Sequence, residues 1–117
     1  MTEPWDGLAL ASIGQPDRTM TFAGGSVRVV LDLPGPVTVG HGVYLPGWRW
    51  STHVGAVTGK ISQHHNGYVL SGRMRVRSRA GAEIEAGSGD AFAVGPGHDA
   101  WVVGDEPCTA LDWSPRN

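Results

Sequence analysis

The chain has 117 residues, a length typical of one domain, and it carries a formal net charge of -2. Its 18 glycines and 8 prolines argue against a helical bundle or a coiled coil, because these two residues are the poorest helix formers. The small negative charge offers no broad basic surface for nucleic acid, and five tryptophans argue against a disordered chain. A turn-rich all-β domain is what remains.

Turn signals recur along most of the chain, and the short runs between them alternate apolar and polar residues as strands do. Residues 1–17 are weakly patterned and are interpreted as a tail or an edge strand. The predicted strands are, in chain order, Thr19–Ala23, Val27–Leu33, Val37–Leu45, Trp48–Val54, Tyr68–Ser71, Met74–Ser78, Glu83–Glu85, Ala91–Val94, Ala100–Val103 and Thr109–Trp113. Residues 55–63 follow no clear period and are predicted to form a loop. Many short strands with regular turns predict a sandwich or barrel.

Positive charge is concentrated in one of these strands. Arg73, Arg75, Arg77 and Arg79 recur at every second position, which places them on one face of a strand. We interpret this face as solvated, because antiparallel sheets often leave one side in water.

The sequence gives no sign of a membrane or an export route. It has no apolar run of the roughly 20 residues that a membrane helix needs, and its first residues are acidic rather than basic and apolar. The one cysteine, Cys108, has no internal partner for a disulfide and is expected to be a small core residue. A cytoplasmic location is the expectation.

All five histidines lie between positions 41 and 98, and three of them fall near spaced glycines. Gly47 is followed by five residues and then His53, while His65 is followed by six residues and then Gly72. Further on, Gly89 opens the segment GDAFAVGPGHDAW. These segments resemble the two sequence motifs of the cupin superfamily over about residues 37–113. The resemblance implies a small single-domain cupin over residues 1–117, with a double-stranded β-helix, which is a jelly-roll barrel of two antiparallel sheets.

The match departs from the family at its metal-ligand positions. The second His of the first motif falls on Gly55, its Glu falls on His65, and the final His of the second motif falls on Ala100. His98, two residues before Ala100, could supply a replacement from the same face of a strand.

Two interpretations of these histidines follow. In the first, His53, His65 and His98 hold a divalent metal (Zn, Fe, Ni or Mn), with His53 and His65 as catalytic residues. In the second, the metal site has degenerated, and His53 and His65 hydrogen-bond an organic ligand while His98 is a turn residue. No organic cofactor is expected in either case.

Arg49, Ser51 and His53 alternate along the predicted strand Trp48–Val54 and would share one face of it. If that face is the barrel interior, Arg49 and Ser51 are candidate ligand-binding residues, together with Trp101. A buried Arg49 needs an anionic partner. The candidates are a ligand carboxylate or one of the side chains Glu83, Glu85, Asp99 and Asp112.

The same alternation would place Trp48 and Trp50 on the outer side of the barrel. A pair of exposed tryptophans would be unusual for a monomer, so we expect them to cover a dimer interface or to pack beneath the N-terminal segment.

Three functions fit these residues. The first is a small-molecule-binding cupin acting as a metal-dependent enzyme on a small organic acid or polyketide-like substrate, with dioxygenase, isomerase, lyase or cyclase chemistry. The second is a ligand-binding or sensory module without metal or catalysis. The third is a metal-free enzyme that uses the histidines for acid–base chemistry. The resemblance also implies a homodimer, and neither nucleic acid nor membrane is expected as a partner.

Overall fold

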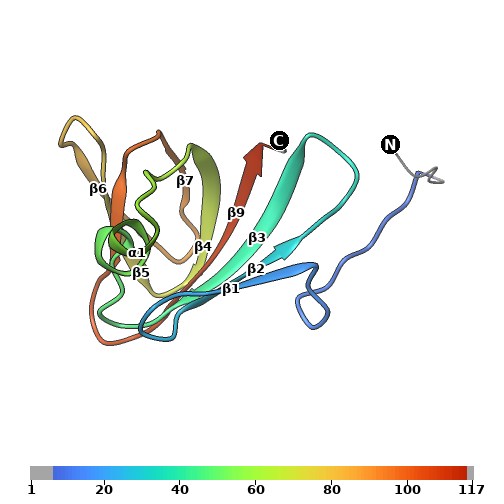
Figure 1. Cartoon of the computed structure of the whole chain (residues 1–117), viewed down its shortest axis with the longest axis horizontal. Helices are drawn as coiled ribbons and strands as arrows, with labels where there is room; N and C mark the ends of the chain where they lie inside the picture. Colours follow the sequence, from blue (N-terminus) through green and yellow to red (C-terminus); the bar gives the residue numbers. More distant parts are fainter. Residues whose placement is uncertain (1–6, 116–117) are drawn as a thin grey trace.

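The computed structural model describes residues 7–115, which form two antiparallel sheets that face each other (Figure 1). The larger sheet has the strand order β1-β2-β3-β9-β4-β7, and the smaller has the order β6-β5-β8. The strands are β1 (Arg18–Thr21), β2 (Val27–Leu31), β3 (Val37–Tyr44), β4 (His65–Ser71), β5 (Arg73–Arg77), β6 (Glu83–Gly87), β7 (Ala91–Val94), β8 (Asp99–Val102) and β9 (Cys108–Pro115). The predicted all-β jelly-roll barrel is confirmed.

The core lies between the two sheets and follows the two-residue period of the strands. In β9, Cys108, Ala110 and Asp112 are buried, whereas Trp113 points to the opposite, outer side. In β5, Met74 and Val76 are buried between exposed arginines. The inward-facing apolar side chains of both sheets therefore form one cluster, which includes Val69 and Cys108 at 0% exposure.

Arg73, Arg75 and Arg77 of β5 lie on the outer face of the small sheet, as predicted for a solvated strand face, whereas Arg79 lies in the turn after the strand. Arg75 Nε lies 2.7 Å from Glu83 Oε1, and Arg73 Nη1 lies 3.2 Å from Glu85 Oε2. These pairs connect β5 to the neighbouring strand β6 and are open to solvent. Surface pairs of this kind contribute about 0–1 kcal/mol each, so they keep the face soluble more than they stabilise the sheet.

The N-terminal part of the chain differs in two ways from the predicted barrel core of residues 37–113. β1 and β2 precede that range and extend the large sheet by two strands. Residues 7–17 form no strand, and the first six residues of the predicted tail lie outside the described residues. Within residues 7–115, no helix is long and apolar enough to cross a membrane.

The predicted strand Trp48–Val54 is wrong. Only Arg49 forms a single β-bridge, to Trp101, and the chain then turns into a π-helical segment, η1 (Ser51–Gly55), followed by α1 (Ala56–Thr58). The amide N–H of His53 donates to the carbonyl of Arg49 at 2.9 Å, a helical bond that replaces strand pairing. The helix ends at Gly59, whose φ of +71° gives the left-handed cap that glycine favours. The expected loop over residues 55–63 thus begins as helix.

Trp48 lies inside the barrel and Trp50 is half-buried against the core, so neither takes the expected place on an outer face. Trp48 is 6% exposed, and its ring centroid lies 4.6 Å from that of Tyr44 and 6.1 Å from that of Phe22. Trp50 packs against the same core and lies over Gly55, where an added Cβ would be 2.6 Å from the Trp50 ring. The expected outer position of these tryptophans at a dimer interface is therefore wrong, because the segment is helical and does not alternate.

Candidate functional site

Two histidines meet at one end of the barrel. His65 is the first residue of β4, and His98 comes immediately before β8, so the two sheets bring them together across the core. Their ring centroids are 5.2 Å apart, with the ring planes at 64°. Phe92 of β7 packs edge-on to His65 with a centroid distance of 6.0 Å. His98 is buried and His65 is half-buried.

Each ring of this pair is fixed by a backbone carbonyl. The Nδ1 atom of His98 lies 2.7 Å from the carbonyl oxygen of Gly95, and that of His65 lies 3.1 Å from the carbonyl oxygen of Gln63. A carbonyl oxygen can only accept a hydrogen bond, so Nδ1 carries the hydrogen in each ring. Each Nε2 atom therefore keeps its lone pair and is an acceptor.

Both imidazoles are held in the neutral form. Burial lowers the pKa of His65, and the negative charge of Asp112 opposes this only in part. Burial also lowers the pKa of His98, against the hydrogen bond to Gly95, and the neighbouring His65 lowers it further. At neutral pH the pair offers two uncharged nitrogen acceptors, suited to a ligand hydroxyl group or to a transferred proton.

The adjoining interior is filled by the chain's own charged pair. Arg28 donates from Nε to Asp112 Oδ2 at 2.9 Å and from Nη2 to Asp112 Oδ1 at 2.6 Å. The hydrogen bond to Asp112 raises the pKa of Arg28, so the pair stays ionised. It crosses Gly40 of β3, where an added Cβ would lie 2.6 Å from the guanidinium. Sequence reasoning missed Arg28, although the small residues at alternate positions of β3 signalled that something bulky covers that strand.

Two further glycines make room for aromatic rings in the interior. The Tyr44 ring lies over Gly42, and the Phe92 ring lies over Gly67, so close that neither position could carry a side chain without movement. Burial raises the pKa of Tyr44 and keeps its phenol neutral. These rings and the Arg28–Asp112 pair therefore fill part of the barrel interior.

A hollow of about 160 Å³, which we call the barrel mouth, is lined by His98 but not by His65. Ser62 closes one side and donates its hydroxyl to the carbonyl oxygen of His98. Lys60, the single lysine of the chain, also lines the hollow. The remaining lining residues are Trp50, Ser51, Ile61, Gly97 and Asp99.

The predicted ligand-binding residues Arg49, Ser51 and Trp101 do lie together, but Arg49 and Ser51 bind the side chain of Asp99 and Trp101 stacks on Arg49. Arg49 Nε is 2.8 Å from Asp99 Oδ2, and its guanidinium carbon lies 4.4 Å from the centre of the Trp101 ring. Ser51 donates to Asp99 from its backbone N–H and from its hydroxyl, at 2.9 Å each. Of the partners considered for Arg49, the structure therefore supplies Asp99, and a ligand carboxylate is not needed there.

The third predicted metal ligand, His53, does not join the pair. It lies in η1, with its ring edge 3.5 Å from the Cβ position of Gly24, in the turn between β1 and β2. Within residues 7–115 no three His, Cys, Asp or Glu side chains are grouped as metal ligands would be. His53 was expected on a barrel strand, and the helical turn carries it elsewhere.

The side chains near His65 and His98 therefore do not fit the metal site that the cupin motifs describe. Structural and catalytic zinc sites use at least three protein ligands, and two imidazoles fall short of that number. Gly55 and Ala100, at two of the family's ligand positions, have no donor side chain, and Asp112 is occupied by Arg28.

Comparison with known proteins identifies the fold. The chain is similar to an RmlC-like cupin from Shewanella frigidimarina, at 19% identity and a TM-score of 0.65, over 92% of this chain and 90% of that one. It is similar to KdgF from Halomonas sp., at 19% identity and a TM-score of 0.62, over 86% and 87% of the two chains. A cupin-superfamily sugar phosphate isomerase from Silicibacter pomeroyi matches at 17% identity and a TM-score of 0.63, over 86% and 71%.

These likenesses show that the chain has the cupin fold, as the two motifs predicted. No protein-family model matches the sequence, and no curated protein matches it significantly.

Proposed function

We propose that this chain is a small-molecule-binding cupin that holds its ligand at the barrel mouth, between the His65–His98 pair and the hollow lined by Lys60. The observation that carries the proposal is the position of each Nδ1 atom within hydrogen-bond distance of a backbone carbonyl oxygen. Both Nδ1–H groups are bound to backbone carbonyls, so both Nε2 atoms are left as acceptors. Such a pair suits a ligand hydroxyl, and Lys60 suits a carboxylate on the same ligand.

The ligand class is accordingly a small hydroxy acid. The volume of about 160 Å³ admits only a molecule of a few carbon atoms unless the mouth opens further. One structural neighbour is described as a sugar phosphate isomerase, a protein that acts on a hydroxylated anion, which agrees with this chemistry.

Glycolate and acetate test the proposal, because they differ only in the hydroxyl group. We expect millimolar glycolate to shift the imidazole ¹⁵N resonances of His65 and His98, and acetate at the same concentration to shift them far less. His65→Ala and His98→Ala should each abolish the response. His64→Ala is the matched control, because His64 is exposed and adjacent, and should respond like the wild type. Equal responses to glycolate and acetate, or an unchanged response in His65→Ala, would refute the site.

A second candidate function is acid–base catalysis at the same place. The lowered pKa of His65 makes it a free base at neutral pH, and the Nε2 lone pair can accept a proton from a bound hydroxy acid. The metal-dependent alternative is less well supported, because it requires His53 beside the pair. Exchange of the glycolate α-hydrogen with deuterated water separates catalysis from binding, since a binding module would leave that hydrogen in place.

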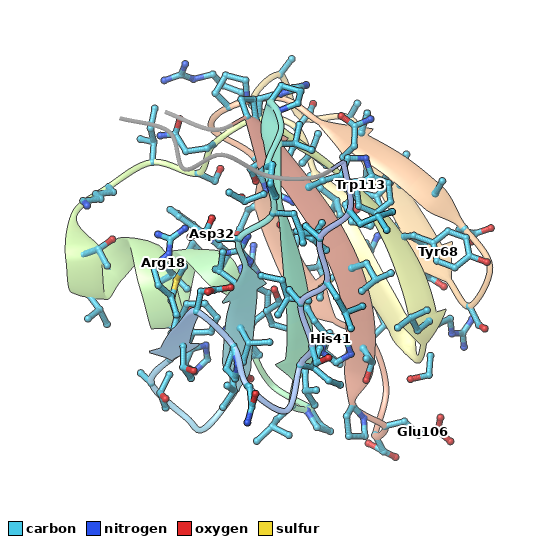
Figure 2. The ribbon with its side chains drawn as sticks, turned by 90° about the vertical axis from the view of Figure 1, so that its right-hand side faces the viewer. Arg18, Asp32, His41, Tyr68, Glu106 and Trp113 are labelled. Carbon is cyan, nitrogen blue, oxygen red and sulfur yellow. The ribbon has the colours of Figure 1, made fainter. Side chains whose placement is uncertain are left out.

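We also propose a homodimer, through a different surface from the one first considered. The outer face of the large sheet exposes Val37, Val43, Tyr68 and Trp113, each 36–39% exposed. Figure 2 looks onto this face and shows Tyr68 of β4 and Trp113 of β9 on it, with His41 of β3 near its centre. The alternation of β3 turns His41 outward as well.

A further inference from the structure

A second hollow, of about 260 Å³, lies apart from the mouth and shares no lining residue with it. Its walls are the turn between β1 and β2, around Gly24 and Ser26, and the turn after β3, at residues 45–47. Trp48 and His53 complete the lining. The function proposed above uses neither of these two residues.

One polar atom of the Trp48 side chain is buried without a partner. Its Nε1–H is the single buried side-chain nitrogen or oxygen with no hydrogen bond found in the part of the chain that the structure describes. An indole N–H can only donate, so what it lacks is an acceptor. Buried polar groups are nearly always paired, and an orphan that belongs to a residue lining a hollow points to a missing ligand atom.

Ser26 supplies a second donor at the same hollow. This residue is 1% exposed, and its Oγ accepts the backbone N–H of Leu45 at 2.9 Å. The hydroxyl hydrogen remains, and none of the hydrogen bonds found over residues 7–115 uses it. The Ser26 hydroxyl can therefore donate to an occupant of the hollow.

His53 supplies a third donor. The backbone N–H of Arg49 donates to His53 Nδ1 at 3.0 Å. The carbonyl of Arg49 lies 3.1 Å from the same atom, but it already accepts the N–H of His53 at 2.9 Å. With Nδ1 as acceptor the hydrogen of the neutral ring is on Nε2, and that atom lies 3.6 Å from the Cβ position of Gly24 at the wall of the hollow.

We propose that this hollow binds the carboxylate of a short aliphatic acid. Three of its lining residues keep a hydrogen-bond donor and none is acidic, a set that suits a carboxylate better than a cation. Ala23, Leu45 and Pro46 provide apolar surface for a short hydrocarbon tail. The site is separate from the His65–His98 pair and does not depend on it.

Propionate is the probe, and the indole ¹H–¹⁵N signals of the five tryptophans are the readout. The Trp48 signal is assigned by its contacts to the Tyr44 and Phe22 rings, so no core variant is needed. We expect propionate at pH 7 to shift this signal downfield, saturably in the millimolar range. Propanol, which has the same tail and no carboxylate, should leave it in place.

Ser26→Ala removes one donor. We expect it to raise the propionate concentration that gives half of the maximal shift in the Trp48 signal, called the midpoint below, at least ten-fold. The other four indole signals report whether this variant keeps its fold, and His53→Gln provides a second variant outside the core strands. His65→Ala should titrate like the wild type, which separates this site from the barrel mouth. A Trp48 signal that ignores propionate, as it would if a water molecule filled the hollow, or an unchanged midpoint in both variants, would overturn the proposal.

Discussion

Three glycines decide what fills the barrel interior. Gly40 lies beneath the Arg28–Asp112 pair, Gly42 beneath Tyr44 and Gly67 beneath Phe92. Glycine in a strand normally weakens it, because it packs no side chain and loses more backbone entropy on folding. At each of these three positions the absence of a side chain leaves room for a larger group from another residue. The charged pair and the rings thus occupy part of the barrel interior.

We predict that Gly40→Ala destabilises the protein. The new methyl group would lie 2.6 Å from Arg28 Nη2 and 2.7 Å from Asp112 Oδ1, so the bidentate pair must separate or shift. Losing charge-assisted hydrogen bonds at a mostly buried pair costs about 1–3 kcal/mol, more than the alanine gains as a better strand residue. Urea denaturation measures the effect. Gly95→Ala is the control, since its Cβ would meet nothing within 4 Å. Equal stability of the two variants would contradict the role assigned to Gly40.

The histidine pair predicts a pH dependence of stability. Burial lowers the pKa of both His65 and His98 below the ordinary value of 6.5, so the unfolded chain binds protons more readily than the folded one. The free energy of unfolding should therefore fall as the pH drops below about 6.5 and continue to fall until the folded-state pKa values are passed.

Replacing both members of the pair with glutamine should reduce this fall between pH 7 and pH 5, as measured by urea denaturation at several pH values. His64→Gln, at an exposed neighbour, should keep the wild-type dependence. A double variant with the same slope as the wild type would show that the pair is not held neutral by the fold.

At the scale of elements, the alternation of apolar and polar residues predicted the strands wherever an element was a simple half-buried strand. The ranges predicted around β2, β3, β5, β7 and β9 agree closely with the observed bounds. The segment from Trp48 to Val54 alternates equally well in sequence and is nevertheless mostly helical. Its conformation is decided by tertiary packing, with Trp48 in the core and Trp50 over Gly55, and a short local pattern does not contain that information.

That one element also determined how much of the site could be predicted. His65 and His98 belong to segments whose placement the motifs fixed, and they do meet. His53 was assigned to the same site only because its segment was interpreted as a strand. Arg49, Ser51 and Trp101 lie together as expected, but Asp99, the shared partner of Arg49 and Ser51, is reached only through the helical turn that follows Arg49. The sequence was enough to name the acidic residues that could pair with Arg49. It was not enough to choose among them, because Asp99 lies 50 positions away along the chain.

At the scale of the whole molecule, the two sheets present different outer faces. The outer face of the small sheet carries the Arg–Glu pairs of β5 and β6. The outer face of the large sheet is apolar at Val37, Val43, Tyr68 and Trp113, and the segment before β1 leaves the barrel on this same side (Figure 1). In that segment Leu8 and Leu10 are 88% and 92% exposed. A second copy would offer both surfaces reciprocally, which is the geometry of a two-fold dimer.

We therefore predict that the wild-type protein elutes in size-exclusion chromatography with light scattering at about twice its 12.3 kDa chain mass. Trp113→Glu should shift it to the monomer, because a charge in the centre of an apolar interface is left unpaired on both subunits. Ile84→Glu is the matched control, since Ile84 is an exposed apolar residue of β6 on the small sheet and should leave the dimer intact. A monomeric wild type at 100 μM, or a dimer that Ile84→Glu disrupts and Trp113→Glu does not, would place the interface elsewhere or remove it.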